Sequence, residues 1–335
     1  MIKVVTRTVV LSIFILTLKS TTATCCSTPS FVPHVFHDRS FLNWSYEKQS
    51  FIPPHSVSVS SSDNTSLFMA SKLLLEYDNS DFSATWEFQE ADMRRKDESD
   101  DSDFYSKPRF QRHVDEWALL SLKSFYRDEI LSISSIKEQN GDKREVDILD
   151  LCSSWISHLP TDNEPNPPPM GVVAGVGMNM EELEANPQLN SWHVQDLNQD
   201  AILKQTFDDE SFDLILNTCS VDYLTNPKEV FEEMHRVLRP GGVALVSFSN
   251  RCFPTKAVKC WVDSDDVGRM GIVSKYYHYS ASWRSIEALD VRLRRSFETV
   301  AEFVQDPESV LRWFAICIFR GTWKNDPIYV VKAVK

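Results

Sequence analysis

Residues 211–249, SFDLILNTCSVDYLTNPKEVFEEMHRVLRPGGVALVSFS, decide the fold of this chain. The stretch begins with an apolar run, 212–217, and ends with a second one, 242–248. Short apolar runs bounded by turn residues are typical of buried strands. The residues between them have the apolar spacing of a helix, so the stretch predicts a strand, a helix and a second strand parallel to the first.

The helix between the two runs has sequence signals at both ends. Three residues mark its start, as N-cap, first helical residue and capping-box acid: Asn226, Pro227 and Glu229. Three apolar residues recur at helical spacing and mark its buried face: Phe231, Met234 and Leu238. Pro240-Gly241-Gly242 then ends the helix and turns the chain into the next strand.

The same alternation extends outward on both sides. Arg112 to Leu131 has the spacing of an amphipathic helix. Three more strands are predicted upstream of residue 211: Val146–Leu151, Gly171–Val176 and Ser191–Gln195. Apolar strands joined by crossover segments indicate an α/β fold with a parallel, doubly wound sheet.

Ligands of such sheets bind beyond the carboxyl ends of the strands. Five segments follow those ends and are the places to look for a site: Asp150–Ser154, Gly175–Asn179, Asp196–Leu197, Asn217–Tyr223 and Ser249–Phe253.

Ser211–Ile215, followed by Val230–Gly242 with its RVLRPGG turn, resembles the fourth-strand and fifth-strand signatures of class I S-adenosylmethionine-dependent methyltransferases. A less detailed resemblance, to a type-11-like subgroup of algae, plants and bacteria, extends from about Asp103 to Val334. It implies a Rossmann-like, mostly parallel sheet with an antiparallel final strand. In this chain Ile286–Val291 and Ile328–Ala333 would end the sheet, with Arg292–Trp323 as a helical insertion. S-adenosyl-L-methionine is the implied cofactor.

One stretch departs from the family pattern. The family has a glycine-rich loop after the first strand, whereas residues 150–155, DLCSSW, contain no glycine. Either Asp150 with Ser153 and Ser154 binds the amino-acid end of the cofactor in a variant loop, or the site has decayed. Gly175-x-Gly177 is not a dinucleotide fingerprint, because Met180 stands where a third glycine is needed.

The resemblance implies further cofactor contacts. Asn179 stands where the family binds the ribose hydroxyls, and Asp196-Leu197 matches the adenine contact. The alternative for Asp196 is a cap on the following turn. Asn217 to Ser220 matches the loop beneath the methyl donor.

Methyl transfer needs alignment, exclusion of water and at most a proton acceptor. Five residues are candidate bases or acceptor-orienting groups, although each can equally be structural: Tyr105, His113, Asp222, Tyr223 and His278. Six aromatic residues either line an apolar acceptor pocket or belong to the core: Phe253, Trp261, Tyr276, Tyr277, Tyr279 and Trp283. Cys152, Cys219 and Cys252 follow neighbouring strands and are expected to be buried structural thiols. The alternative is a thiol-based metal or redox site, although no local spacing signals metal binding.

The remainder of the chain predicts its organisation and partners. Residues 1–23 have the pattern of a signal peptide, which would direct the chain to the secretory route and from there to an endomembrane, secreted or plastid destination. His55–Ser66 is Ser-rich, and Glu90–Asp103 is a dense mixed-charge run with excess acid. These stretches predict that residues 24–102 are largely disordered and precede a domain at 103–335. No transmembrane span is expected in the mature chain.

A net charge of −13 disfavours nucleic acid as a partner. The methyl acceptor expected for such a methyltransferase is a small molecule. The alternative function is a non-catalytic module of the same fold that binds a cofactor or a partner. The sequence does not define the oligomeric state.

Overall fold

The structure is a computed structural model that describes residues 72–161, 166–203, 205–292 and 326–335. All of them belong to one compact unit, Pro53–Lys335. The predicted signal peptide and nearly all of the predicted insertion at 292–323 lie outside the described residues, so both stay predictions. No helix in the described ranges is long and apolar enough to cross a membrane.

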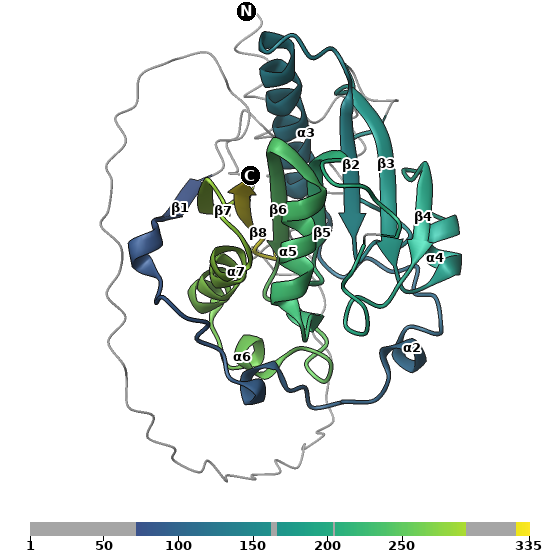
Figure 1. Cartoon of the computed structure of the whole chain (residues 1–335). Coiled ribbons are helices and arrows are strands. Elements are labelled where there is room, and N and C mark those ends of the chain that lie inside the picture. Colours follow the sequence, from purple (N-terminus) through teal and green to yellow (C-terminus); the bar gives the residue numbers. More distant parts are fainter. Residues whose placement is uncertain (1–71, 162–165, 204, 293–325) are drawn as a thin grey trace, which may run out of the picture. The chain divides into compact units, whose positions relative to one another are not determined.

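An eight-stranded mixed sheet forms the centre of the fold, in the order β1-β7-β8-β6-β5-β2-β3-β4 (Figure 1). Its strands are β1 (Lys72–Tyr77), β2 (Val146–Leu151), β3 (Met170–Gly177), β4 (Ser191–Val194), β5 (Phe212–Thr218), β6 (Leu238–Phe248), β7 (Ser285–Asp290) and β8 (Tyr329–Val334). The five strands from β6 to β4 are parallel, whereas β8, β7 and β1 are each antiparallel to their neighbours. The predicted doubly wound sheet with an antiparallel final strand is therefore confirmed.

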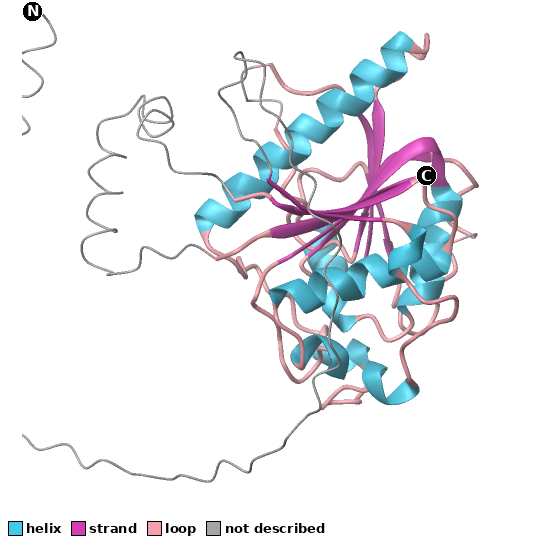
Figure 2. Cartoon of the chain, turned by 90° about the vertical axis from the view of Figure 1, so that its left-hand side faces the viewer, coloured by secondary structure: helices cyan, strands magenta, loops and turns pink. Residues whose placement is uncertain are grey.

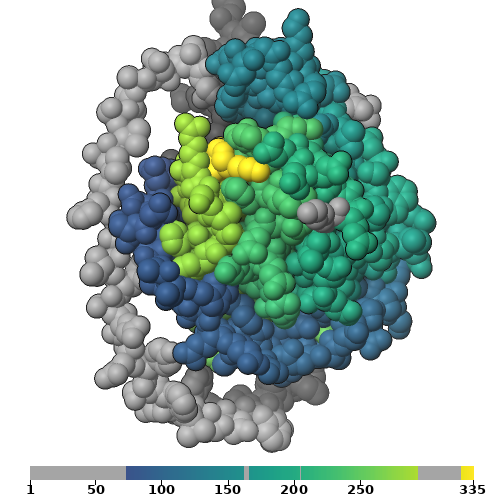
Figure 3. Space-filling model, viewed as in Figure 1, coloured from purple at the N-terminus to yellow at the C-terminus, as the bar shows by residue number. Residues whose placement is uncertain are grey.

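Strand β1 corrects the prediction of a largely disordered region at 24–102 for its last part, residues 72–102. Residues 24–71 lie outside the described residues, so the prediction stays a prediction there. Residues 72–102 form β1, which pairs with β7, and the short helices η1 (Asn79–Asp81) and η2 (Glu90–Met93). Leu74, Leu75 and Tyr77 pack against the core, and this apolar contact is what the polar composition of the surrounding sequence concealed. Figure 3 shows this segment in dark blue along the left and lower margin of the unit.

Helices cover both faces of the sheet (Figure 2). One face is covered by α3 (Glu116–Gln139), and the other by α5 (Pro227–Val237) and α7 (Asp266–Ser280). Successive residues of β5 take opposite sides, since Leu214 and Leu216 pack with α3 whereas Ile215 packs with α5 and α7. The remaining helices are short: α2 (Asp101–Phe104), α4 (Met180–Glu184), α6 (Lys259–Val262) and η3 (Val221–Tyr223).

The N-terminus of α5 differs from the prediction in one detail. Pro227 is the first helical residue, as expected, but the side chain of Asn226 does not cap the helix. Its amide instead donates to the carbonyl oxygen of Asn198, 3.2 Å away. A tertiary contact has therefore replaced the local cap.

Asp213 connects the two halves of the family signature. Its buried carboxylate accepts hydrogen bonds from Lys137 Nζ of α3 at 2.6 Å, from Arg239 Nη1 of β6 at 2.8 Å and from the Asp147 amide of β2 at 3.0 Å. Gly242 packs beside it, and a Cβ atom there would lie 2.8 Å from the Arg239 carbonyl oxygen. The signature thus joins β5 to β6, β2 and α3 at the end of the sheet away from the cavity described below.

We predict that Asp213→Asn lowers the free energy of unfolding by about 1.5–3 kcal/mol, because it removes the carboxylate that Lys137 and Arg239 share and leaves Asp142 and Asp147 as their remaining acidic partners. Urea unfolding followed by circular dichroism measures this loss. Glu232→Gln, which removes an exposed ion pair with Lys228 on α5, is the control and should cost less than about 1 kcal/mol. Equal losses in the two variants would contradict the role assigned to Asp213.

Candidate functional site

The candidate site lies at the switch point of the sheet. Strand β2 pairs in parallel with β3 on one side and with β5 on the other, so the chain leaves the ends of these strands in opposite directions. A cavity of about 180 Å³ opens there. Its walls are the loops that follow β2, β3, β4 and β5, and its roof is the segment 101–114.

Six of the seven residues predicted to bind the cofactor line this cavity: Asp150, Ser153, Ser154, Asn179, Asp196 and Leu197. The seventh, Asn217, lies beneath the floor, only 1 % exposed. Its amide nitrogen is 3.4 Å from Cys152 Sγ, and none of the described residues donates to its Oδ1. The topology has therefore brought together residues that are up to 47 positions apart in the sequence.

The glycine-free loop after β2 folds with a cysteine in a backbone conformation that favours glycine. Cys152 has a φ of 57°, in the left-handed region, which costs a non-glycine residue about 1–2 kcal/mol. Asp150 Oδ2 accepts a hydrogen bond from Ser153 Oγ at 2.6 Å. Burial raises the pKa of Asp150 to about 6, against the lowering effect of the serine hydroxyls.

A glycine that supports this loop is on the next strand. The Ser153 amide donates to the Val176 carbonyl at 2.8 Å, and a Cβ atom on Gly177 would lie only 2.2 Å from the Ser153 carbonyl oxygen. Asn186 adds hydrogen bonds to the Ser154 carbonyl at 2.8 Å and to Ser157 Oγ at 2.9 Å. Close packing on β3 and the side chain of Asn186 thus hold the loop.

Two of the predicted contacts have other partners in the structure. Asp196 Oδ1 accepts from the Asn198 amide at 2.9 Å, so Asp196 does cap the following turn. Asn179 caps α4 by accepting from the Glu182 amide at 3.1 Å, and it donates to the Tyr105 carbonyl at 2.8 Å. Capping uses only one oxygen of Asp196, whereas the oxygen and the amide nitrogen of Asn179 both have protein partners.

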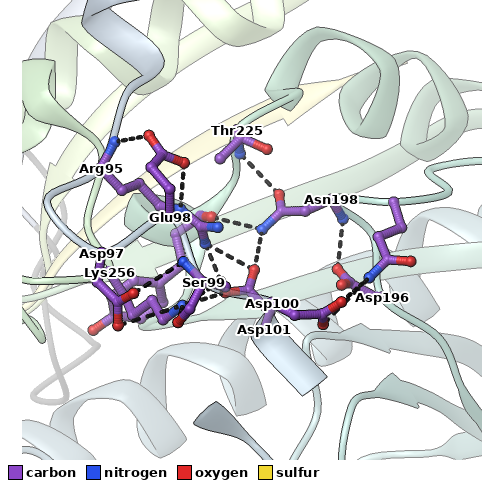
Figure 4. A network of polar contacts seen from close by, with 12 residues as sticks. Arg95, Asp97, Glu98, Ser99, Asp100, Asp101, Asp196, Asn198, Thr225 and Lys256 are labelled. Atoms are coloured by element: carbon purple, nitrogen blue, oxygen red, sulfur yellow. Dashed lines mark hydrogen bonds and ion pairs between the residues drawn. The ribbon is translucent and has the colours of Figure 1, made fainter. Parts of the chain in front are cut away.

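The roof is fastened at its first residue by a buried polar network (Figure 4). Asp101 is only 4 % exposed. Arg95 Nη1 donates to both of its carboxylate oxygens, at 2.7 and 2.8 Å. Lys256 Nζ lies 3.2 Å from Asp101 Oδ1, and Asn198 Nδ2 donates to Oδ2 at 2.9 Å. Asp101, Asn198 and Asp196 also line a second, polar cavity of about 330 Å³.

The far end of the roof is fastened by Asp115. The Asp115 amide donates to Asp326 Oδ2 at 2.8 Å, and the Asp326 amide donates back to Asp115 Oδ2 at 2.5 Å. Sequence reasoning missed this roof, since its two anchoring contacts, Asp101–Lys256 and Asp115–Asp326, carry no local spacing signal and join residues 155 and 211 positions apart.

Three of the five candidate catalytic residues line the cavity: Tyr105, His113 and Tyr223. The other two are not among the lining residues. Asp222 is buried at 3 % exposure, and His278 stacks on Phe82 with ring centroids 4.3 Å apart. Arg109 and Glu182 also line the cavity, and sequence reasoning did not assign them a role.

Of the six aromatic residues considered for an acceptor pocket, only Phe253 lines the cavity. Trp261, Tyr276 and Tyr277 belong to the core, because α6 and α7 turn these rings inward. Tyr279 packs on Trp86, and Trp283 packs on Tyr277. For these five the structural interpretation is the correct one.

The three cysteines after the strands do not form a thiolate site. Burial raises the pKa of Cys152 and of Cys219 to about 12, so both are neutral thiols at physiological pH. Burial also raises the pKa of Cys252. Within the described part of the chain no group of three or more His, Cys, Asp or Glu side chains is arranged to hold a metal ion.

Asp222 should make stability depend on pH. Burial raises its pKa to about 7, well above the value of about 3.9 in an unfolded chain. The folded state therefore holds a proton that the unfolded state releases between about pH 4 and 7, and stability falls as the pH rises through this window.

We predict that Asp222→Asn removes this loss, so that from pH 4 to pH 8 the variant gains about 2–4 kcal/mol of unfolding free energy relative to the wild type. Urea unfolding across this pH range measures the difference. Asp208→Asn, at an exposed position, serves as the control. Its unfolding free energy should change with pH in the same way as that of the wild type. Parallel curves for Asp222→Asn as well would show that Asp222 ionises normally.

Comparison with known proteins adds a family match within this fold. Residues 170–246 match the family described as "Methyltransferase domain". The biotin biosynthesis bifunctional protein BioHC of Teredinibacter turnerae is 35% identical over 72 residues, which are 22% of this chain and 12% of that protein. The malonyl-[acyl-carrier protein] O-methyltransferase of a Marinomonas species is 26% identical over 104 residues, 31% of this chain and 37% of that protein. The chain thus spans well under half the length of either relative.

Among solved structures, a putative sarcosine dimethylglycine methyltransferase from Galdieria sulphuraria has a TM-score of 0.37 at 13% identity, covering 70% of this chain and 98% of that one. A SAM-dependent methyltransferase from Archaeoglobus fulgidus has a TM-score of 0.36 at 11% identity, covering 66% of this chain and 100% of that one.

The matched residues 170–246 run from β3 to the middle of β6, across the parallel part of the sheet and both halves of the signature. With the order and direction of the strands, this match identifies the chain as one that carries a class I methyltransferase domain with a Rossmann-like fold.

Proposed function

We propose that this chain transfers a methyl group from S-adenosyl-L-methionine to a small-molecule acceptor. The observation that carries the proposal is the cavity at the switch point, with Asp150 near the end of β2 and Asp196-Leu197 after β4 on its walls. These residues suit the two ends of the cofactor. Asp150 can accept from its ammonium group, whereas Asp196 can accept from the adenine amine while Leu197 packs on the ring.

The proposed reaction needs little chemistry from the protein. When bound, the cofactor supplies a methyl group that its positively charged sulfur already activates. The chain must align the acceptor and exclude water, and the roof at 101–114 is the segment placed to do both.

His113 is the group best placed to take a proton from an acceptor. Burial, and then the charge of Arg109, lower its pKa below the ordinary value of about 6.5, so the neutral imidazole dominates at pH 7. Burial raises the pKa of Tyr105 and of Tyr223, so these phenols keep their protons. Tyr223 Oη already accepts from the Phe253 amide at 2.8 Å, which orients its ring at the cavity wall.

A second candidate is a non-catalytic module of the same fold. It is favoured by the hydrogen bond from Ser153 to Asp150, because that contact satisfies within the protein one of the two oxygens that the ammonium group would use. Binding of the cofactor separates a site that still holds S-adenosyl-L-methionine from one that has lost it.

We predict that the full chain binds S-adenosylmethionine and S-adenosylhomocysteine with micromolar affinity in calorimetric titration. Asp150→Ala and Asp196→Ala should each weaken binding about 10-fold to 100-fold, since each removes a hydrogen bond to a carboxylate, worth about 1.5–3 kcal/mol. Asp263→Ala, at an exposed ion pair beyond α6, is the matched control and should bind as the wild type does. A folded wild type that binds neither ligand would instead support the non-catalytic module.

A further inference from the structure

Arg109 is a fixed positive charge on the cavity wall. Its guanidinium lies over the ring of Phe104, 4.2 Å from the centroid, with the ring of Phe253 at 5.7 Å. Arg109 Nη2 donates to the Phe104 carbonyl at 2.8 Å. Stacking and this hydrogen bond preorganise the side chain, and a preorganised guanidinium loses little freedom when it binds a ligand.

No carboxylate of the described chain lies within 4.0 Å of the Arg109 guanidinium nitrogens. The acids that line the cavity have other hydrogen-bond partners. Asp101 is paired to Arg95 and Lys256, and Asp150 accepts from Ser153 Oγ. Most of the N–H donors of the Arg109 guanidinium are therefore available to a ligand.

The other basic groups of this wall are either paired or neutral. Arg112 forms an ion pair with Glu116 at 2.7 Å. Burial lowers the pKa of His158 to about 4, and it also lowers the pKa of His113. At pH 7 Arg109 is thus the one cation among the described lining residues that has no carboxylate partner.

Glu182 connects Arg109 to the glycine-free loop. One of its carboxylate oxygens accepts from the Arg109 backbone amide at 2.6 Å, and the other accepts from Ser154 Oγ at 2.5 Å. Arg109 is therefore held beside the loop in which the family uses glycine to bring backbone close to the cofactor. In this chain an unpaired guanidinium is available at that place, and a guanidinium binds a carboxylate through two parallel hydrogen bonds.

We propose that Arg109 is the residue that binds the carboxylate group of a ligand in this cavity. This inference rests on the proposed function, and the carboxylate has two possible sources, the amino-acid end of the cofactor or an anionic acceptor. A carboxylate from either source would accept the same two parallel hydrogen bonds from the guanidinium. The two sources are separated by which ligand loses affinity when Arg109 is changed.

The first arm titrates the full chain with S-adenosylhomocysteine and with its decarboxylated analogue, S-adenosyl-3-thiopropylamine. If the cofactor supplies the carboxylate, the wild type binds the first ligand at least tenfold more tightly, and Arg109→Gln binds both equally. Arg109→Lys keeps the positive charge but not the planar guanidinium. It should therefore recover part of the preference for S-adenosylhomocysteine over the decarboxylated analogue. Arg144→Gln removes a paired guanidinium at an exposed position outside the cavity lining and should keep all of this preference.

The second arm titrates malonate, as a carboxylate probe, into protein saturated with S-adenosylhomocysteine and into protein without it. If an acceptor supplies the carboxylate, the wild type binds malonate, Arg109→Gln binds it at least tenfold more weakly, and the adenosyl ligands show no change. Urea unfolding confirms that each variant is folded.

Equal affinities of the wild type and folded Arg109→Gln in both arms would overturn the inference while leaving the proposed function intact. A wild type that binds no adenosyl ligand would overturn the proposed function instead. In that case malonate binding to the unliganded wild type, lost in Arg109→Gln, would still support carboxylate binding by Arg109. Absence of malonate binding as well would overturn both.

Discussion

The site depends on the parallel pairing of β2 with two different neighbours. Because β3 and β5 both run in the same direction as β2, their carboxyl ends meet at one edge, and because the chain departs in opposite directions from β2 and β5, that edge stays open. If the connections after β2 and β5 both ran in the same direction along the sheet, one of them would cover the edge where the cavity lies. Asp150, Asn179 and Asp196 reach the same cavity only for this reason.

A roof then closes the cavity, and ion pairs rather than apolar packing fasten its beginning. Asp101 binds Arg95, Lys256 and Asn198, which come from three separate parts of the chain (Figure 4). A carboxylate at 4 % exposure is stable only when its charge and its lone pairs are both satisfied, and these partners satisfy them. Such a network defines one position for the roof, whereas apolar contacts tolerate small shifts.

The residues that identify the family and the residues that would do chemistry lie at opposite ends of the sheet. Asp213, Arg239 and Gly242 make the signature recognisable, and they join strands at the end away from the cavity. The matched range, 170–246, excludes both the loop after β2 and the roof. The match thus supports the scaffold directly, whereas the proposed function rests on cavity residues that lie partly outside the matched range.

The sequence by itself determined the order and type of the central elements, because apolar periodicity and turn residues act over a few positions. The strand predicted at Val146–Leu151 is β2 itself, and the helix after Asn226 begins at Pro227 as expected. Local signals were also enough to mark Asp150 and Asp196 as residues at the ends of strands.

Only the tertiary structure decided the rest. The strand at Lys72–Tyr77 exists because β7 offers it an edge, and the roles of Asp101, Arg109 and Glu182 depend on partners up to about 155 positions away. Asp222 and His278 are excluded from the cavity by packing that no local pattern encodes. Hydrogen bonds and ion pairs of this kind act over a few ångströms in space, so their partners can stand anywhere along the chain.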